Sequence, residues 1–549
     1  MKLVTLPEMQ KIEQEADANG LTFDQMMENA GHNLAKEVLN LVSSQDDEEV
    51  QVLGLVGPGN NGGDTLVALA HLAEKGWKAR AYLVRRKVGD ALAKRLEEAN
   101  GEIVLAEKDT DFTRLTAFLG TADLLLDGLL GTGFKLPLKG EIANVLSATK
   151  TAIADQPWPP YIVAVDCPSG VDCDTGEAAK ETLTADATVT MAAVKQGLLK
   201  VPAFDLAGEI HVVGIGLPDD LPTWKAVVNE VADEDLVLSL LPTRPADAHK
   251  GTFGTALVVA GSVNYTGAVL LAGKAAYRAG TGLVTLAIPA SLHLALAGHF
   301  PEATWLLLPN ELGVISVDAT SILLKNLERA TALLIGPGFG LEGTTRDFLE
   351  KLFEGTASAK QAQGRIGFVK NESQAAKVEP VHLPPVVLDA DGLKLLAQIK
   401  NWPKLLPAPA ILTPHPGEMA VLTGWTVDKI QEDRLGTARH FAGEWGHVVV
   451  LKGAFTVVAA PDGRTTTIPV ATPALARAGT GDVLAGIIVG LRAQGLDAYA
   501  AAVAGTWIHA QAGLFAADAV GNPASVMAGD ILDSIADVLA GLSAEEDVL

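Results

Sequence analysis

The stretch Ala474-Leu475-Ala476-Arg477-Ala478-Gly479-Thr480-Gly481-Asp482-Val483-Leu484 decides how the second half of this chain is interpreted. It predicts a turn that opens a helix, because Gly479 and Gly481 accept backbone dihedrals that a Cβ disfavours. Backbone N–H groups at the start of such a helix form an anion site. Asp482 would repel a bound phosphate, which favours a base that deprotonates a hydroxyl while the turn holds a phosphoryl group. An Asp that caps an ordinary helix fits the spacing equally well.

Length, charge and cysteine content narrow the class of protein. A chain of 549 residues exceeds one hydrophobic core and predicts two or more domains. Its formal net charge of −24 disfavours nucleic acid and anionic membranes as partners. Two cysteines, Cys167 and Cys173, provide neither a disulfide framework nor a metal-ligand quartet, which favours a reducing cytoplasm. We expect no signal peptide, because the first twenty residues lack an apolar core, and no membrane span.

A glycine-rich loop follows the first predicted strand. Residues 50–56 are apolar, Gly57-Pro58-Gly59-Asn60-Asn61-Gly62-Gly63-Asp64 comes next, and helical periodicity begins at once. A strand, a glycine loop and a helix form a phosphate-binding βα unit. The loop is neither a G-x-G-x-x-G nor a Walker sequence, and Asn60 and Asn61 add side-chain amides. A plain turn with a helix cap is the alternative.

Polar residues stand at three predicted strand ends of the first half. Helices are expected at 8–18 and 26–41, and further strands at 79–84, 103–106, 123–127 and 161–166, which predicts a parallel sheet with helices on both faces. The strand ends carry Asn60 with Asn61, Asp127, and Asp166 with Ser169. Ligands bind at such ends. Asn61, Asp127 and Ser169 offer oxygen atoms with at most one formal charge, which favours a hard monovalent cation over zinc.

These three loops together resemble the epimerase domain of NAD(P)H-hydrate repair enzymes, over roughly residues 1–220. The resemblance implies a Rossmann-like domain that interconverts the R and S forms of a C6-hydroxylated dihydronicotinamide. It implies a potassium ion held by Asn61, Asp127 and Ser169, and Asp166 as the acid–base residue. The implied contacts to the hydrate are Asn60, Asn61, Gly62, Gly63, Asp64, Gly131, Thr132, Gly133, Phe134, Lys135, Leu136, Pro137 and Asp166. In Lys195-Gln196-Gly197-Leu198, Gln196 stands where the family often has Pro or Leu.

A second domain is expected after a proline-containing junction. Prolines and acidic residues at 214–243 predict surface linker, and we place the boundary between residues 225 and 226. Strands are expected at 255–260, 283–288, 332–335, 386–388, 411–413 and 447–451, with a helix at 267–279. This pattern predicts a second, larger parallel αβα sandwich. The polar segment 356–380 is interpreted as a surface loop or insertion.

Three further motifs each have an ordinary interpretation. Gly336-Pro337-Gly338-Phe339-Gly340 follows a strand and is either a ligand-facing loop or a flexible turn. His415 lies between two prolines at a strand end and is either structural or part of a site. Lys452-Gly453-Ala454-Phe455-Thr456 joins two strands and is either a nucleotide contact or a hairpin with an exposed lysine.

Taken with residues 478–482, these motifs resemble the ribokinase-like superfamily and, within it, the nucleotide-dependent NAD(P)H-hydrate dehydratases, over about residues 240–545. The resemblance implies that Asp482 is catalytic and that Ala268, Gly338, His415 and Asp482 contact the hydrated nucleotide. Its implied adenine-nucleotide contacts are Lys452, Gly453, Ala454, Phe455, Thr456 and Gly481. Thr472 replaces the usual Asn, so we expect altered loop anchoring without loss of chemistry.

The two resemblances together imply an α/β protein of two αβα three-layer domains with two activities on one substrate. Phosphorylating the C6 hydroxyl of the S hydrate makes phosphate the leaving group, and elimination restores NAD(P)H. Fused relatives imply ADP with Mg²⁺, and hence release of AMP and phosphate, and they imply a homo-oligomer. The rival interpretations are an ordinary kinase of a vitamin or sugar hydroxyl, which leaves the first domain unexplained, and a nucleotide-sensing scaffold without turnover.

Overall fold

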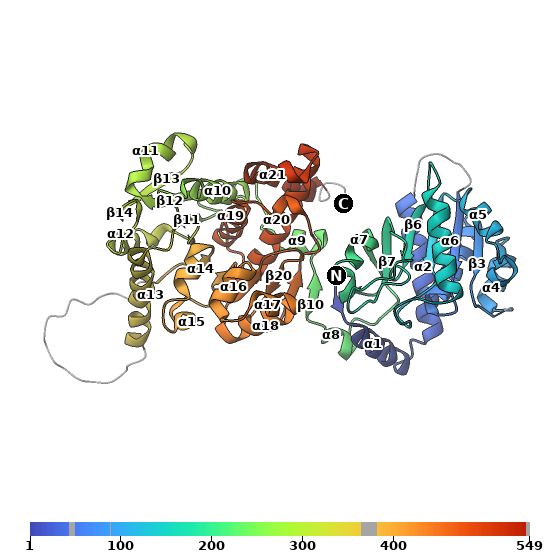
Figure 1. Cartoon of the computed structure of the whole chain (residues 1–549). Coiled ribbons are helices and arrows are strands. Elements are labelled where there is room, and N and C mark those ends of the chain that lie inside the picture. Colours follow the sequence, from blue (N-terminus) through green and yellow to red (C-terminus); the bar gives the residue numbers. More distant parts are fainter. Residues whose placement is uncertain (43–49, 88, 364–381, 545–549) are drawn as a thin grey trace. The chain divides into compact units, whose positions relative to one another are not determined.

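The computed structural model describes residues 1–42, 50–87, 89–363 and 382–544. The chain forms two compact units, Met1–Asn229 and Glu230–Leu549. Each unit is built around a β-sheet with helices on both of its faces (Figure 1). The two units are described separately below.

The sheet of the first unit is entirely parallel and has the strand order β4-β3-β2-β5-β6-β7-β9. The order reverses between β2 and β5, and the crevice at such a reversal is where Rossmann-like sheets bind ligands. The strands are β2 (Gln51–Val56), β3 (Lys78–Leu83), β4 (Glu102–Leu105), β5 (Leu124–Gly128), β6 (Tyr161–Val165), β7 (Ala187–Met191) and β9 (Glu209–Val213).

Alternate residues of these strands point into two different cores. Val52 and Leu124 pack with the helices of one face, whereas Leu53 and Leu125 pack with those of the other. The first face carries α1 (Leu6–Ala18), α2 (Phe23–Val42), α3 (Asn60–Glu74) and α4 (Ala91–Glu98). The second carries α5 (Thr113–Leu119) and α6 (Glu141–Ala154). Outside the sheet, β1 (Leu3–Val4) pairs with β8 (Val194–Lys195), and α7 spans Ala203–Ala207.

Within the described residues, the sheet of the second unit has ten strands in the order β10-β21-β20-β19-β18-β17-β16-β11-β12-β13. Its central part is parallel, but β20 runs antiparallel to both β19 and β21. The expectation of a wholly parallel sheet is therefore wrong at this edge, because the five-residue connection 452–456 allows a hairpin and no crossover. The main strands are β11 (Thr255–Val259), β12 (Leu283–Pro289), β13 (Thr304–Leu308), β16 (Ala332–Ile335), β17 (Val386–Leu388), β18 (Ile411–Leu412), β19 (Val448–Leu451), β20 (Val457–Ala459) and β21 (Thr465–Thr467).

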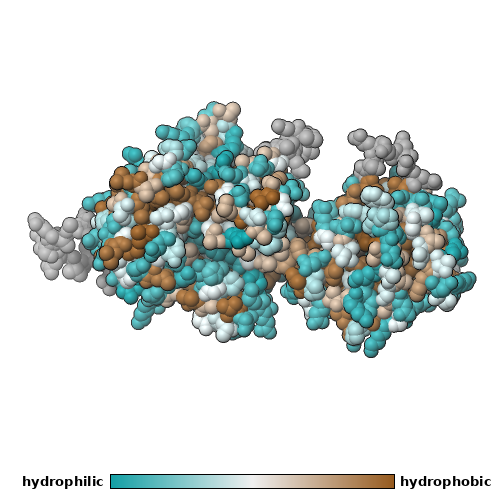
Figure 2. Space-filling view, turned by 45° about the horizontal axis from the view of Figure 1, so that its top comes forward, coloured by the Kyte–Doolittle hydropathy of each residue, from teal (hydrophilic) through white to brown (hydrophobic). Residues whose placement is uncertain are grey.

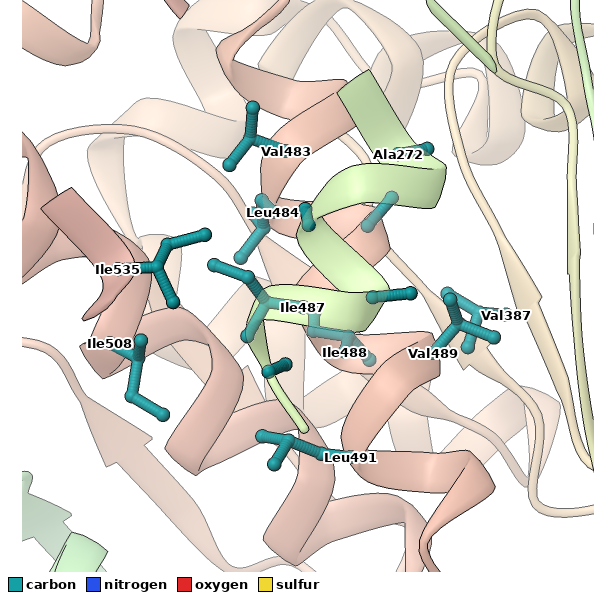
Figure 3. Packing of buried hydrophobic residues seen from close by; sticks show 14 of the residues in the cluster. Ala272, Val387, Val483, Leu484, Ile487, Ile488, Val489, Leu491, Ile508 and Ile535 are labelled. Atoms are coloured by element: carbon teal, nitrogen blue, oxygen red, sulfur yellow. The ribbon is translucent and has the colours of Figure 1, made fainter. Parts of the chain in front are cut away.

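Helix α19, which contains the glycine turn and Asp482, is almost wholly buried. It spans Thr480–Ala493 and packs with α10 (Thr266–Arg278), α20 (Ala498–Val520) and α21 (Ala528–Ala544) on one face of the sheet. Figure 3 shows Ile508 and Ile535 on one side of α19 and Val387 of the sheet on the other. This packing fixes the position of the first turn of α19 beside the carboxyl ends of the sheet strands.

The opposite face of this sheet carries a second set of helices and its own core. These are α12 (Ala319–Lys325), α13 (Gly343–Gln363), α14 (Asp391–Leu396), α15 (Trp402–Leu405), α16 (Pro416–Thr423), α17 (Val427–Glu432) and α18 (Arg434–Trp445). A four-residue helix α11 (His293–Leu296) and the hairpin β14 (Asn310–Glu311) with β15 (Val314–Ile315) follow β12 and β13.

Two segments differ from the expected loops. The proposed linker 214–243 contains α8 (Pro222–Lys225), β10 (Asn229–Val231) and α9 (Glu234–Leu240), because apolar residues such as Val231 and Val237 are buried. The expected loop 356–380 is wrong for residues 356–363, which continue α13, since no glycine or proline in them stops a helix. The rest of that segment, from residue 364, lies outside the described residues.

The visible surface is largely hydrophilic, with smaller hydrophobic areas between the polar residues (Figure 2). Among the described residues, no helix has the length and apolar character that crossing a membrane requires.

Candidate functional site

A cavity of about 510 Å³ opens at the crevice of the first unit, beside the ends of β2 and β5. Its lining combines the loop after β2, the loop after β5 and side chains of α1 and α2. The predicted substrate contacts that line it are Asn60, Asn61, Gly62, Asp64, Gly131, Thr132, Gly133 and Asp166. Sequence motifs far apart in the chain thus meet at one cavity, as the topology requires.

The remaining predicted contacts lie away from this lining. Gly63 faces α2, where an added Cβ would come within 2.6 Å of the Met27 sulfur. Phe134, Lys135, Leu136 and Pro137 lie in the half-exposed to exposed loop that follows, and none of them is among the lining residues. Their contact with substrate stays a prediction.

The three residues predicted to hold a cation converge around Leu130. The Asn61 side-chain nitrogen donates to the Val165 carbonyl oxygen at 2.6 Å and to that of Leu130 at 3.3 Å. The Ser169 hydroxyl accepts from the Leu130 amide at 2.9 Å, and the Asp127 carboxylate accepts from the Ser169 amide at 2.9 Å. Gly131 must be glycine here, because a Cβ would lie 2.4 Å from the Asn61 side-chain oxygen.

This cluster fits an alkali cation by its chemistry. Every potential ligand atom is an oxygen, and Asp127, which is fully buried, supplies the single formal charge. Burial raises the pKa of Asp127, against hydrogen bonds from Ser169 and Leu129 that lower it, so a nearby cation would stabilise its ionised form. Among the described residues, no group of three or more His, Cys, Asp or Glu side chains is placed to hold a metal ion.

Asp166 is clamped by groups from β7 and β8. It follows β6 in a left-handed conformation, with φ of 66°, which is strained for a residue with a Cβ. Its carboxylate accepts hydrogen bonds from the Thr190 hydroxyl at 3.1 Å and the Met191 amide at 3.0 Å, and it forms an ion pair with the Lys195 ammonium. Lys195 is 2% exposed. Sequence reasoning missed this lysine, although a charge at the end of the apolar run 191–194 was a usable signal.

Two further carboxyl groups line the same cavity. Asp64 is on α3 and is 6% exposed, and Glu13 is on α1. Burial, with Asp166 and Glu13 nearby, raises the pKa of Asp64 well above its usual range. Burial also raises the pKa of Glu13, against the effect of Lys195. Glu13 was not predicted, because only the fold brings α1 to the crevice.

In the second unit, the glycine turn has the predicted form with one difference. Gly479 precedes α19 with φ of 90°, but Gly481 lies within the helix. An added Cβ at Gly481 would lie 3.5 Å from the Lys452 ammonium, an ordinary contact, so the space around it does not by itself require glycine. Asp482 is the third residue of α19 and does not cap it, so the interpretation of Asp482 as a helix cap is wrong. Burial first, and then Asp389, raise the pKa of Asp482 to about 7.

A buried network of charges surrounds Asp482. The Lys452 ammonium donates to the Asp389 carboxylate at 2.7 Å and lies 3.6 Å from the Glu418 carboxylate. Burial alone would lower the pKa of Lys452, but Asp389 and Glu418 outweigh it and raise that pKa. The Thr413 hydroxyl also donates to Asp389 at 2.7 Å. Asp389 was not selected from the sequence, since an acidic residue after a strand is common in turns.

His415 joins this network through the start of α16. Its Nδ1 accepts from the Gly417 amide at 3.0 Å, and its amide donates to the Glu418 carboxylate at 2.9 Å, forming a reciprocal cap. Burial lowers the pKa of His415. The predicted histidine therefore has a structural role, and its exposed ring leaves it able to contact a ligand as well.

Ala268, in the first turn of α10, lies next to Gly338, in the loop that follows β16. An added Cβ at Gly338 would approach the Ala268 Cβ to 2.9 Å, and Gly338 has φ of 64°. Both positions therefore require a small residue.

A cavity of about 190 Å³ lies beside the first turn of α19. Of the predicted nucleotide contacts, it is lined by Lys452, Gly453, Ala454, Thr456 and Gly481, whereas Phe455 is not in its lining. Thr472 and His509 also line it. Burial lowers the pKa of His509 to about 4, so its imidazole is neutral at pH 7. A residue 27 positions after Asp482 gave no signal in the sequence.

The chain matches two protein families and is similar to several named proteins. Residues 256–359 and 366–536 match the family NAD(P)H-hydrate dehydratase, and residues 23–197 match the YjeF-related protein N-terminus. The chain is 36% identical to the bifunctional NAD(P)H-hydrate repair enzyme Nnr of Moorella thermoacetica, over 100% of this chain and 98% of that protein. The corresponding enzyme of Salinibacter ruber is 36% identical over 95% and 93% of the two chains.

A solved structure also matches the second unit. It is that of ADP/ATP-dependent NAD(P)H-hydrate dehydratase from Bacillus subtilis, co-crystallised with ATP and Mg²⁺. The identity is 29%, the match covers 57% of this chain and 98% of that one, and the TM-score is 0.45.

Proposed function

Because the chain belongs to the family of bifunctional NAD(P)H-hydrate repair enzymes, we propose that it restores hydrated NADH and NADPH by two reactions. One reaction interconverts the R and S hydrates, and the other removes water from the S hydrate. We assign epimerisation to residues 1–225 and dehydration to residues 226–549. The separate matches of residues 23–197 and 256–536 to two families support this assignment.

The Asp482 carboxyl is the observation that carries the dehydration proposal. A buried base with a pKa of about 7, in the first turn of a helix, is suited to take the proton of the C6 hydroxyl. The N–H groups of that turn stabilise charge on the arriving phosphoryl group. Phosphate then leaves from C6, and the dihydronicotinamide is restored. Ala268, Gly338 and His415 contact the hydrate beside Asp482.

ADP is the proposed phosphoryl donor, which leaves AMP after transfer. The cavity beside α19 supports its placement, with Lys452, Gly453, Ala454, Phe455, Thr456 and Gly481 as its contacts. Mg²⁺ neutralises charge on the nucleotide phosphates when it is bound.

Epimerisation is assigned to the larger cavity, with Asp166 as its acid–base residue. Asp166 has a strained backbone conformation, and three neighbouring groups hold its carboxylate in place. Both observations support a functional role for Asp166. We propose that Asn61, Asp127 and Ser169 hold K⁺, whose charge would order the two loops that form the floor of the cavity. The substrate contacts are those predicted from the sequence.

A homo-oligomer in the cytoplasm completes the proposal, with small molecules as the only ligands and neither nucleic acid nor membrane as a partner. Both cysteines are free thiols and are buried, which suits a reducing compartment.

The experiment that tests this function uses a mixture of R and S hydrates of NADH with Mg²⁺, K⁺ and either ADP or ATP. Dihydronicotinamide absorbance is followed to completion. Conversion of both epimers with ADP is the expected result. If the S hydrate is converted and the R hydrate is converted no faster than spontaneous epimerisation allows, the epimerase assignment is wrong. No conversion with either nucleotide would favour a kinase of another hydroxyl substrate or a nucleotide sensor.

A further inference from the structure

Asp64 has no structural role that accounts for a buried carboxyl group. It lies in the second turn of α3, whose cap is Gly59, so it does not cap the helix. Among the described residues, its carboxyl group has no hydrogen-bond or ion-pair partner within the protein. An unpaired carboxyl group is costly to bury, so a position of this kind indicates function. The Asp64 side chain lines the same cavity as Asp166.

The two carboxyl groups come from positions on either side of β5. Asp64 is on the helix that follows β2, and Asp166 follows β6, and both strands pair directly with β5. Strands in a sheet lie about 4.8 Å apart, so these two strand ends are separated by roughly 10 Å. Both side chains line one cavity of about 510 Å³, which has room for a nicotinamide ring.

The charges around the two groups differ in a way that suits opposite tasks. Asp166 is paired with the Lys195 ammonium, which favours a carboxylate able to accept a proton. Asp64 faces Glu13 of α1 and Asp166, while Lys195 and Arg86 act on it only weakly by comparison with burial. Burial and these like charges raise the pKa of Asp64, which favours the protonated form of its carboxyl group. Two carboxyl groups with environments of this kind form an acid–base pair.

The geometry points to Asp64 as the proton donor for epimerisation, acting on the C6 oxygen of the hydrate while Asp166 serves the opposite face of C6. This inference rests on the proposed epimerase function and deepens it. Asp64 gives its proton to the C6 oxygen, the C6–O bond breaks with its electron pair on oxygen, and water leaves. The N1 lone pair forms an N1=C6 double bond, which leaves one positive charge on the ring.

A water molecule then adds to the other face of C6. The new O–C6 bond forms, the N1=C6 electrons return to N1, and the proton of the added water goes to the Asp166 carboxylate. Proton exchange with solvent restores both groups. The step consumes one water and releases one water, and nothing is oxidised or reduced. In the reverse direction the two carboxyl groups exchange tasks.

The test measures interconversion of the purified S and R hydrates by chromatography in the full-length protein, with K⁺ and without nucleotide. We expect Asp64→Asn to lower kcat by about 100-fold or more, with KM changed only a few-fold, and Asp64→Glu to restore part of the rate. The wild-type rate should fall as pH rises through the Asp64 titration, and the residual rate of Asp64→Asn should lack that fall. Glu74→Gln, an exposed carboxyl-to-amide change at the far end of α3, is the matched control and should retain the wild-type rate.

The outcomes separate this inference from the proposed function. An inactive wild-type protein overturns the epimerase proposal itself. An active wild type with an equally active Asp64→Asn variant, or a slow variant that keeps the wild-type pH profile, overturns only the role of Asp64. Retained dehydration of the S hydrate by the variant verifies that the chain is folded. If the variant does not fold, epimerisation by the wild type is measured in ¹⁸O-labelled water. We expect the C6 hydroxyl of the product to gain one solvent oxygen per turnover. Retention of the original oxygen would refute the release of water.

Discussion

The two candidate sites combine a lysine and an aspartate in different ways. In the first unit, Lys195 pairs directly with Asp166, the proposed acid–base residue. In the second unit, Lys452 pairs with Asp389 at 2.7 Å, and among the described residues Asp482 has no ion-pair partner. Burial first, and then Asp389, raise the pKa of Asp482 to about 7. The lysine therefore pairs with the proposed acid–base residue in one site and with a neighbouring aspartate in the other.

The largest expected effect comes from exchanging each proposed acid–base residue for its amide. Asp482→Asn should lower the rate of S-hydrate dehydration by about 10²–10⁴-fold, because the amide cannot take the hydroxyl proton, while epimerisation continues. Asp166→Asn should do the reverse. Both rates are measured for each variant on separated hydrates, and nucleotide binding by calorimetry verifies the second site. Loss of both activities in either folded variant would contradict two independent sites.

Lys195→Met should destabilise the first unit by about 3–5 kcal/mol, because it leaves the Asp166 charge buried without its partner. Hydrogen exchange of peptides from β7 should accelerate, while peptides from β19 in the second unit serve as the internal control. The double variant Lys195→Met with Asp166→Asn should recover part of the loss. Unchanged exchange in the single variant would show that the ion pair does not stabilise the unit.

A smaller effect concerns the pH dependence of dehydration. Asp482 must be ionised to accept a proton, so kcat/KM for the S hydrate should fall about tenfold per pH unit below pH 7. Asp389 raises the pKa of Asp482 and Lys452 lowers it. Asp389→Asn removes the charge that raises the pKa of Asp482 and frees Lys452 from its ion pair. The acidic limb of the pH profile of kcat/KM should therefore move to lower pH. A limb that stays in place or moves upward would refute this electrostatic coupling. Rates at saturating nucleotide make the measurement.

Much of the fold followed from local patterns, since most strands of both sheets lie within one or two residues of their predicted bounds. The antiparallel edge at β20 and β21 did not, although the hairpin interpretation of residues 452–456 was compatible with it, because the preceding series of parallel strands favoured another parallel strand. The prolines within 214–243 favoured a linker over the regular elements that the structure has there. The apolar side chains of these elements are buried because each element packs within its own unit.

The site residues divide in a similar way. Glycine loops and the acidic residues at strand ends were visible because backbone geometry demands them locally. Glu13 and His509 were not, because each reaches its cavity from a distant segment. Lys195 follows an apolar run and Asp389 follows a strand, but the role of each depends on the ion pair that it forms in the folded chain. A buried charge is meaningful only through its partner, and the partner is a property of the tertiary structure.

The smallest expected effect concerns Thr472, which stands where the family commonly has Asn. Its hydroxyl accepts a hydrogen bond from the Ala474 amide at 3.3 Å, and its side chain lines the cavity beside α19. Asn makes the same kind of cap, so Thr472→Asn should change KM for the nucleotide by less than about threefold and leave kcat unchanged. Thr472→Val, which keeps the shape but removes the acceptor, should cost roughly 1 kcal/mol, about fivefold in KM. Steady-state kinetics with varied ADP compare the two variants. If Asn raised KM more than Val did, side-chain size in the cavity, rather than the cap, would govern this position.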